Sequence, residues 1–323
     1  MIEVKNLVKR YGNHLAVDDL SFTIEKGKIY GFLGPNGAGK STTMNIITGY
    51  LASTKGEVYI DGHNILEEAK EAKKCIGYLP EQPPVYPDMT VMEYLQFVAE
   101  LKKIPKENRN HEIAEIMEMV KITDMSKRLI KNLSKGYRQR VGLAQALIGH
   151  PDIIILDEPT VGLDPKQIIE IRDLIKSLKE KHTVILSSHI LSEVSAVCDY
   201  ILIISHGKLA ASGTPDQLGE MALGSNTLEI TVKGEKDRIE DSIKKLENLD
   251  EYQIEEDEGE KAFKVILKTK EGRDIRENVF YNMAEVRCPI IQMQMNKVSL
   301  ENIFLELTED QGEEEGKEND GHL

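Results

Sequence analysis

The chain has 323 residues, 40% apolar and 30% charged, which is long enough for two globular domains of about 150 residues each. Its formal net charge of −14 argues against binding to nucleic acid or anionic lipid, because the surface would repel both polyanions. Cys75, Cys198 and Cys288 are not spaced as metal ligands and indicate free thiols in a reducing compartment. No run of about twenty apolar residues occurs, so work at a membrane would need another chain to span it.

Residues 1 to about 80 are predicted to be rich in strands. The start, MIEVKNLVKRYGN, alternates apolar and charged residues, which is typical of a strand and not of an export signal. Turns then separate the strand-like runs AVDDLSFTIEKG, KIYGFLG, GEVYIDG and CIGYLP.

From residue 90 the pattern becomes helical. Thr90 followed by Glu93 is a capping-box pair, and VMEYLQFVAELK and HEIAEIMEMVK repeat apolar residues at helical spacing. Between 152 and 205, short apolar runs alternate with amphipathic helices, which indicates a parallel sheet with both faces covered.

The stretch ASGTPDQLGEMALGSN, residues 211–226, is rich in turn residues and marks the expected boundary between a first domain, 1–217, and a second, 220–308. The later patterns, in the order strand, helix, strand, strand, helix, strand, predict a small ferredoxin-like unit. An amphipathic segment, SLENIFLEL, comes next. The acidic tail, 309–323, has too few apolar groups to order itself.

The segment from Gly34 to Ser41 fits the phosphate-loop pattern G-x-x-x-x-G-K-[ST], and it lies between a predicted strand and a predicted helix. Glycines allow backbone N–H groups to surround phosphates. Lys40 can reach the β and γ phosphates, and the Ser41 hydroxyl can ligate Mg²⁺.

A second acidic motif, DIIILDEPTVGLD, follows an apolar strand. Asp157 ends this strand at the sheet edge where ligands of α/β proteins bind, so it can hold Mg²⁺ directly or through water. Glu158 follows and can turn toward the γ-phosphate to orient or deprotonate water.

With these motifs the chain resembles the ATP-binding subunit of an ABC transporter over about residues 1–217. GPNGAGKST resembles that family's phosphate loop, LSKGY its signature, IIILDEP its second nucleotide motif and GLD (162–164) its dimer-contact loop. Tyr11 matches the aromatic residue that stacks on adenine, Gln82 the glutamine of the switch loop and His189 the switch histidine. The resemblance implies a P-loop NTPase of ABC ATPase type, an α/β fold with a parallel-sheet core, an antiparallel β subdomain and a helical subdomain, here with a small C-terminal α+β domain.

The resemblance also implies roles for single residues. Glu158, His189 and Gln82 are the expected catalytic residues, and Ser41, Gln82 and Asp157 the expected Mg²⁺ ligands. The residues expected to bind ATP are Tyr11, Gly34, Pro35, Asn36, Gly37, Ala38, Gly39, Lys40, Ser41, Thr42, Ser134, Gly136, Tyr137 and Asp164.

The family's ATPase domains dimerise head to tail, so each signature covers the γ-phosphate bound by the other domain. Ser134 suits a helix N-cap, and Gly136 allows close approach of the backbone. Lys135 and Tyr137 depart from the usual Leu-Ser-Gly-Gly-Gln. Lys135 either points a cation toward phosphate or is solvated, and the side-chain amide contact is not expected at Tyr137.

The favoured hypothesis is an exporter ATPase, a homodimer or a heterodimer with a related subunit, held at the inner face of the cell membrane by a separate membrane subunit. No nucleic-acid partner is expected. Two alternatives remain: a soluble ABC protein acting mechanically on DNA or the ribosome, and a regulatory ATP-binding protein without turnover. The C-terminal unit either extends the dimer interface or regulates the ATPase.

Overall fold

The computed structural model describes residues 1–221, 227–257, 262–269 and 273–296, and the chain divides into two compact units, Met1–Pro215 and Asp216–Leu323. The expected SLENIFLEL segment and the acidic tail lie outside the described residues. Within the described ranges, no helix is both long and apolar enough to cross a membrane.

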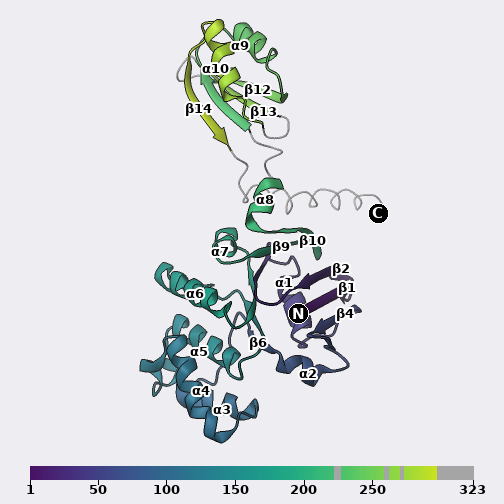
Figure 1. Ribbon diagram of the computed structural model, residues 1–323, viewed down its shortest axis with the longest axis vertical. Helices are drawn as coiled ribbons and strands as arrows, with labels where there is room; N and C mark the ends of the chain where they lie inside the picture. Colours follow the sequence, from purple (N-terminus) through teal and green to yellow (C-terminus); the bar gives the residue numbers. More distant parts are fainter. Residues whose placement is uncertain (222–226, 258–261, 270–272, 297–323) are drawn as a thin grey trace, which may run out of the picture. The chain divides into compact units, whose positions relative to one another are not determined.

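The first unit is built on two sheets (Figure 1). The six-stranded sheet has the order β10-β9-β3-β8-β7-β6, and all its neighbouring strands are parallel except β10 and β9. Its strands are β3 (Ile29–Leu33), β6 (Ile76–Leu79), β7 (Ile153–Asp157), β8 (Thr183–Ser188), β9 (Tyr200–Ser205) and β10 (Lys208–Gly213). The antiparallel sheet has the order β2-β1-β4-β5, with β1 (Ile2–Tyr11), β2 (His14–Ile24), β4 (Lys55–Ile60) and β5 (His63–Asn64).

Burial explains why the central strands read as unbroken apolar runs. Every residue of β3, β7 and β8 is buried, as expected where both faces of a parallel sheet are covered. The two sheets share one hydrophobic core, in which Phe22 of β2 meets Phe32 of β3 edge to face at 5.1 Å between ring centroids.

Helices complete this unit. They are α1 (Lys40–Ile47), α2 (Ala69–Lys74), α3 (Val91–Leu101), α4 (Lys106–Met119), α5 (Lys135–Leu147), α6 (Pro165–Leu178) and α7 (Leu191–Ser195). Short 3-10 helices span Thr123–Met125 and Ile130–Asn132. Helix α3 begins with the predicted capping box, in which Thr90 accepts from the Glu93 backbone N–H while the Glu93 carboxylate accepts from that of Thr90. The expected parallel core, antiparallel subdomain and helical subdomain are therefore all present.

One part of the expected boundary is more ordered than its composition indicates. Strand β10 continues to Gly213, and helix α8 (Pro215–Met221) follows. Proline is well suited to the first helical position, because its missing N–H would have no partner there.

The second unit contains β11 (Thr227–Val232), α9 (Lys236–Ile243), β12 (Leu249–Asp257), β13 (Ala262–Thr269), α10 (Arg276–Glu285) and β14 (Ile290–Asn296). Its antiparallel sheet has the order β12-β13-β11-β14, and the β-α-β-β-α-β sequence of elements is that of a ferredoxin-like unit. Its own hydrophobic core contains Leu228, Ile230, Ile239, Val265 and Val279.

We expect Thr90→Ala to lower the free energy of unfolding by about 1 kcal/mol, because the cap hydrogen bond at the start of α3 is lost. Urea unfolding measures the change. Thr123→Ala is the matched control, since Thr123 is exposed and lies in a 3-10 helix without a side-chain cap. Equal losses in both variants would contradict a stabilising role for the capping box.

Candidate active site

A cleft of about 490 Å³ lies beyond the carboxyl ends of β3, β7 and β8. This volume falls in the range of small-molecule sites, and this edge of an α/β sheet is where their ligands bind. Its lining residues are Tyr11, His14, Ala16, Asn36, Gly37, Gly39, Lys40, Ser41, Thr42, Glu81, Glu158, Val161 and His189.

The loop between β3 and α1 forms one wall of the cleft, and two of its positions require glycine. Gly39 has φ 99°, and a Cβ there would lie 2.5 Å from the Ala16 carbonyl oxygen. A Cβ on Gly34 would lie 2.3 Å from the Ile204 carbonyl oxygen. The glycines therefore let the loop pass close to neighbouring backbone before α1 begins at Lys40.

The Lys40 side chain lies at the base of this loop and is only 6% exposed. Its Nζ donates to the carbonyl oxygens of Gly34 at 2.8 Å and Pro35 at 3.1 Å, and it lies 3.8 Å from the Glu158 carboxylate. Burial lowers the pKa of Lys40, while the nearby carboxylates of Glu158 and Asp157 oppose that shift. The loop thus holds a poorly solvated cation beside the cleft.

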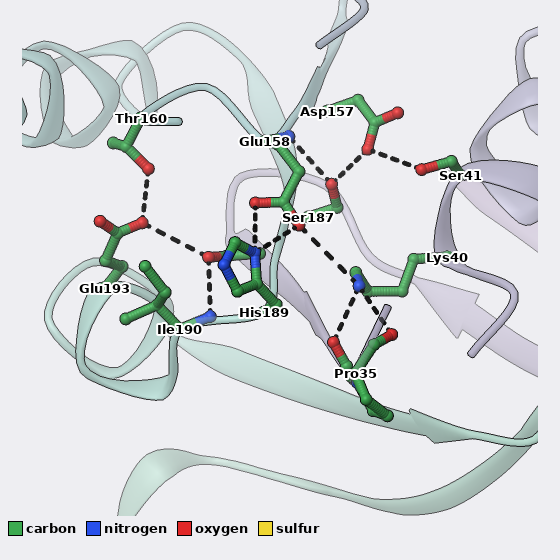
Figure 2. Close-up of polar contacts among 12 residues, drawn as sticks. Pro35, Lys40, Ser41, Asp157, Glu158, Thr160, Ser187, His189, Ile190 and Glu193 are labelled. Carbon is green, nitrogen blue, oxygen red and sulfur yellow. Dashed lines mark hydrogen bonds and ion pairs between the residues drawn. The ribbon is translucent and has the colours of Figure 1, made fainter. Parts of the chain in front are cut away.

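A row of oxygen atoms joins α1 to β7 and β8. The hydroxyl of Ser41 donates to Asp157 Oδ1 at 3.4 Å, and Ser187 donates to the same oxygen. Figure 2 shows Ser41, Asp157 and Ser187 in this row. Hydroxyl and carboxylate oxygens suit Mg²⁺, which is usually held by one or two protein carboxylates together with substrate phosphates. The donor set therefore fits this ion.

Glu158 has left-handed backbone geometry, with φ 48°, and its N–H donates to Ser187 Oγ at 3.0 Å. Its two carboxylate oxygens each lie 3.1 Å from His189 Nδ1 (Figure 2). Burial raises the pKa of Glu158, while the hydrogen bond to His189 and the charge of Lys40 act in the opposite direction. The result is a desolvated carboxylate that faces both a histidine and an ammonium.

Most of the expected phosphate-loop residues line the cleft, and so do Tyr11, Glu158 and His189. Gly34, Pro35 and Ala38 are not lining residues: the first two support Lys40 through their carbonyls, and Ala38 is buried. Asp157 is also absent from the lining but is hydrogen-bonded to Ser41, which lines it.

Gln82 is exposed and does not line the cleft of this structure, whereas its neighbour Glu81 does, so the expected role of Gln82 stays a prediction. The register of the sheet places Glu81 level with Glu158. Leu79 of β6 pairs with Leu156 of β7, so Glu81 and Glu158 each lie two residues beyond a paired position.

Four expected ATP-binding residues, Ser134, Gly136, Tyr137 and Asp164, do not line the cleft of a single chain. Ser134 is the N-cap of α5 and Asp164 that of α6, and each accepts a backbone N–H through its side chain. Their expected contact with ATP bound to a second chain stays a prediction.

Lys135, the unusual signature residue, is exposed and packs against Gly162 of its own chain, in the segment expected to contact a second subunit. A Cβ on Gly162 would lie 2.2 Å from Lys135 Nζ. Larger residues at position 162 would therefore displace this ammonium.

Comparison with known proteins agrees with this geometry. The family described as ABC transporter matches residues 17–161. The linearmycin resistance ATP-binding protein LnrL of Bacillus subtilis (strain 168) is 32% identical over 309 residues, covering 95% of this chain and 98% of that relative. The chain belongs to the family of ABC transporter ATP-binding proteins.

Two further likenesses extend this result. The bacitracin transport ATP-binding protein BcrA of Bacillus licheniformis is 43% identical over 211 residues, covering 65% of this chain and 68% of that relative. A dimeric ATP-binding cassette solved with ADP and Pi is 28% identical, with a TM-score of 0.61, over 66% of this chain and 98% of that one. The ABC subunit is therefore an ATP-binding protein and an ATPase of P-loop fold.

The structure adds site residues that the sequence motifs did not identify. Glu81, His14 and Val161 line the cleft, and Ser187 links Asp157 to the Glu158 backbone. Ser187 lies near the end of β8, two residues before His189. Its place at a strand end beside a predicted site residue was the sequence signal that could have identified it. Glu81 had no such signal, because the register of β6 against β7 is not written in the sequence.

Since burial raises the pKa of Glu158 above its ordinary value of 4.5, we expect kcat/KM for ATP to fall on acidification at a pH above 4.5. The active form is the carboxylate, so activity is present above the folded-state pKa and is lost below it. Steady-state ATPase rates measured across pH test this. Full activity maintained down to pH 4.5 would contradict the buried-base assignment.

Proposed function

We propose that this ABC subunit couples binding and hydrolysis of MgATP to export of a substrate through a separate membrane subunit. The observation that carries the proposal is the convergence of Lys40, Glu158 and His189 on one cleft, from three segments far apart in the sequence. Convergence of a phosphate-binding cation, a buried carboxylate and a histidine suits phosphoryl transfer to water.

In this proposal ATP extends along the cleft. Tyr11, which is 49% exposed, stacks on adenine. The loop from Gly34 to Thr42 surrounds the phosphates with backbone N–H groups, and Lys40 contacts the β and γ phosphates. Ser41, Asp157 and Gln82 are the residues we propose to hold Mg²⁺. When bound, the ion neutralises phosphate charge as the γ-phosphoryl group departs.

Hydrolysis depends on Glu158 and its partner. The carboxylate accepts a proton from the attacking water, whose oxygen bonds to the γ-phosphorus as the bond to the β-phosphate oxygen breaks. His189, held 3.1 Å from both carboxylate oxygens, orients Glu158 and contacts the γ-phosphate. The desolvated surroundings strengthen these interactions, because little water screens them.

A second subunit completes the site in this proposal. Ser134, Gly136 and Tyr137 of one chain cover the γ-phosphate bound by the other, and Asp164 lies at the dimer contact. Only ATP is held from both sides, so ATP and ADP bias the closed and open states differently. The partner is a second copy or a related ATPase subunit.

Transport outward is proposed from relatives whose names state linearmycin resistance and bacitracin transport. A mechanical ATPase of the ribosome or DNA is not favoured by these relatives. We further propose that Mg²⁺, the membrane partner and attachment at the inner face of the membrane belong to this subunit as they do to its family.

Exposed aromatic residues of the first unit are the proposed docking site for the membrane subunit. Tyr50 and Tyr86 are 75% and 51% exposed. Tyr50 packs against Tyr78 at 5.9 Å between centroids, and Tyr86 packs against Tyr94 and Phe97 at 6.0 and 5.5 Å. Exposed aromatic groups of this kind are typical of protein interfaces.

We expect Glu158→Gln to retain ATP binding while its turnover falls about 10²- to 10⁴-fold, because the amide keeps the shape of the side chain but cannot accept the proton. Equilibrium ATP binding and steady-state phosphate release measure the two effects. Glu170→Gln, in α6 and away from the cleft lining, is the matched control. Unchanged turnover in Glu158→Gln would refute the catalytic assignment.

Purification of Glu158→Gln from solubilised membranes in MgATP, followed by mass spectrometry, tests the transport function. We expect a membrane-spanning protein to copurify, and its recovery to fall at least several-fold when Tyr86→Ala is added, since an aromatic anchor is lost. Phe280→Ala, an exposed aromatic of the second unit, is the control. Recovery of ribosomes or nucleic acid alone would overturn the transporter proposal.

A further inference from the structure

Glu193 of α7 is a buried carboxylate close to the active site that the proposed reaction does not use. It is 7% exposed, and its Oε2 accepts hydrogen bonds from the hydroxyls of Thr160 and, at 3.4 Å, Ser188. Its Oε1 lies 4.0 Å from a guanidinium nitrogen of Arg172 in α6. Burying a carboxylate is costly without such partners, so these contacts define where Glu193 lies.

The hydrogen bonds of Glu193, together with two short stretches of backbone, form a closed ring with the catalytic pair, and Figure 2 shows these hydrogen bonds. Thr160 stands two residues after Glu158. Ser188, which donates to Glu193, also accepts from the Ile190 N–H at 3.0 Å. Hydrogen bonds therefore hold both chain neighbours of His189, Ser188 and Ile190. The ring closes where His189 meets Glu158 at 3.1 Å.

We propose that Glu193 is a positioning residue that holds His189 against Glu158 and connects this pair to the dimer-contact loop. The inference rests on the proposed ATPase function. The His189 side chain is 39% exposed, so packing constrains its position less than packing constrains a buried side chain. Glu193 holds the Ser188 hydroxyl, which accepts from the Ile190 N–H, and its two hydroxyl partners are themselves buried, since Thr160 is 6% and Ser188 1% exposed.

The same ring reaches the segment expected to touch a second subunit. The Thr160 carbonyl accepts from the Leu163 N–H at 3.2 Å, and Asp164 follows as the cap of α6. A shift of this segment on dimer closure therefore moves the Thr160 hydroxyl, and with it Glu193 and the turn that carries His189. Glu193 thereby makes the geometry of the hydrolytic pair depend on the state of the dimer contact.

A purely structural role for Glu193 would give a different result. An anchor for α7 alone would affect thermal stability, and activity only in proportion to the folded fraction. A positioning role also changes the surroundings of the Glu158 carboxylate, which faces Lys40 of α1, Asp157 of β7 and His189 after β8. The pH dependence of turnover separates the two roles. A smaller folded fraction lowers the rate but leaves the shape of the pH–rate profile unchanged.

The test compares Glu193→Ala, Glu193→Gln and Thr160→Val with the unaltered full-length chain, by ATPase kinetics across pH and by thermal unfolding. The control is Asp199→Asn. Asp199 also accepts hydrogen bonds through its carboxylate, from the Ile29 N–H at 2.8 Å and Lys179 at 2.6 Å, but it lies at the opposite edge of the parallel sheet. Glu193→Gln keeps one oxygen able to accept a hydrogen bond.

We expect kcat of Glu193→Ala to fall about 10- to 100-fold, as for a small misplacement of catalytic groups, with KM for ATP within about twofold. The acid limb of its pH–rate profile, where activity falls on acidification, should move to higher pH. The reason is that the His189 hydrogen bond that favours the Glu158 carboxylate is weakened. Glu193→Gln should recover part of kcat, and Thr160→Val should lower kcat in the same way. Asp199→Asn should leave the acid limb in place.

An unchanged kcat and acid limb in folded Glu193→Ala would overturn the inference, as would a loss that Asp199→Asn reproduces. If Glu193→Ala does not fold, Thr160→Val decides, since it removes one donor and keeps the carboxylate: an unchanged acid limb in Thr160→Val overturns the inference. Absence of ATPase activity in the unaltered chain, alone and with its copurified partner, would instead refute the proposed function itself.

Discussion

The charge pair between Lys40 and Glu158 is the constraint on which the rest of the site depends. Their atoms lie 3.8 Å apart at side-chain exposures of 6% and 9%, and neither charge is stable there without compensation. The loop supplies carbonyl acceptors to the ammonium, and His189 and Ser187 supply contacts to Glu158 and its backbone. A site built in this way is prepared for a phosphate group before any substrate binds, because its partial charges are already in place.

The parallel sheet makes this arrangement possible. Strands β3, β7 and β8 are neighbours in the order β3-β8-β7, so their carboxyl ends bring together residues near positions 40, 158 and 189. Full burial of these strands fixes their ends, and the glycines at 34 and 39 let the loop approach neighbouring backbone. Glu193 then joins the two segments that follow β7 and β8 through buried hydrogen bonds, in the role proposed for it.

Local features were predictable where neighbouring residues determine them. The Thr90 and Glu93 capping box, the phosphate loop before α1 and the buried strand ending at Asp157 all follow from short patterns. Features that depend on tertiary register were not: Glu81 lines the cleft, and it lies two residues beyond Leu79 as Glu158 lies two beyond the paired Leu156. The ring through Glu193 joins residues 33 positions apart by side-chain geometry, which no local pattern encodes.

The central claim is that this cleft binds the phosphates of ATP through Lys40. The most direct measurement is the equilibrium dissociation constant of ATP for the unaltered chain and for Lys40→Ala, with the exposed Lys28→Ala as control. Loss of charge-assisted hydrogen bonds of about 1.5–3 kcal/mol predicts roughly 10- to 100-fold weaker binding for Lys40→Ala and no change for Lys28→Ala. Equal ATP affinity in all three proteins would contradict the account.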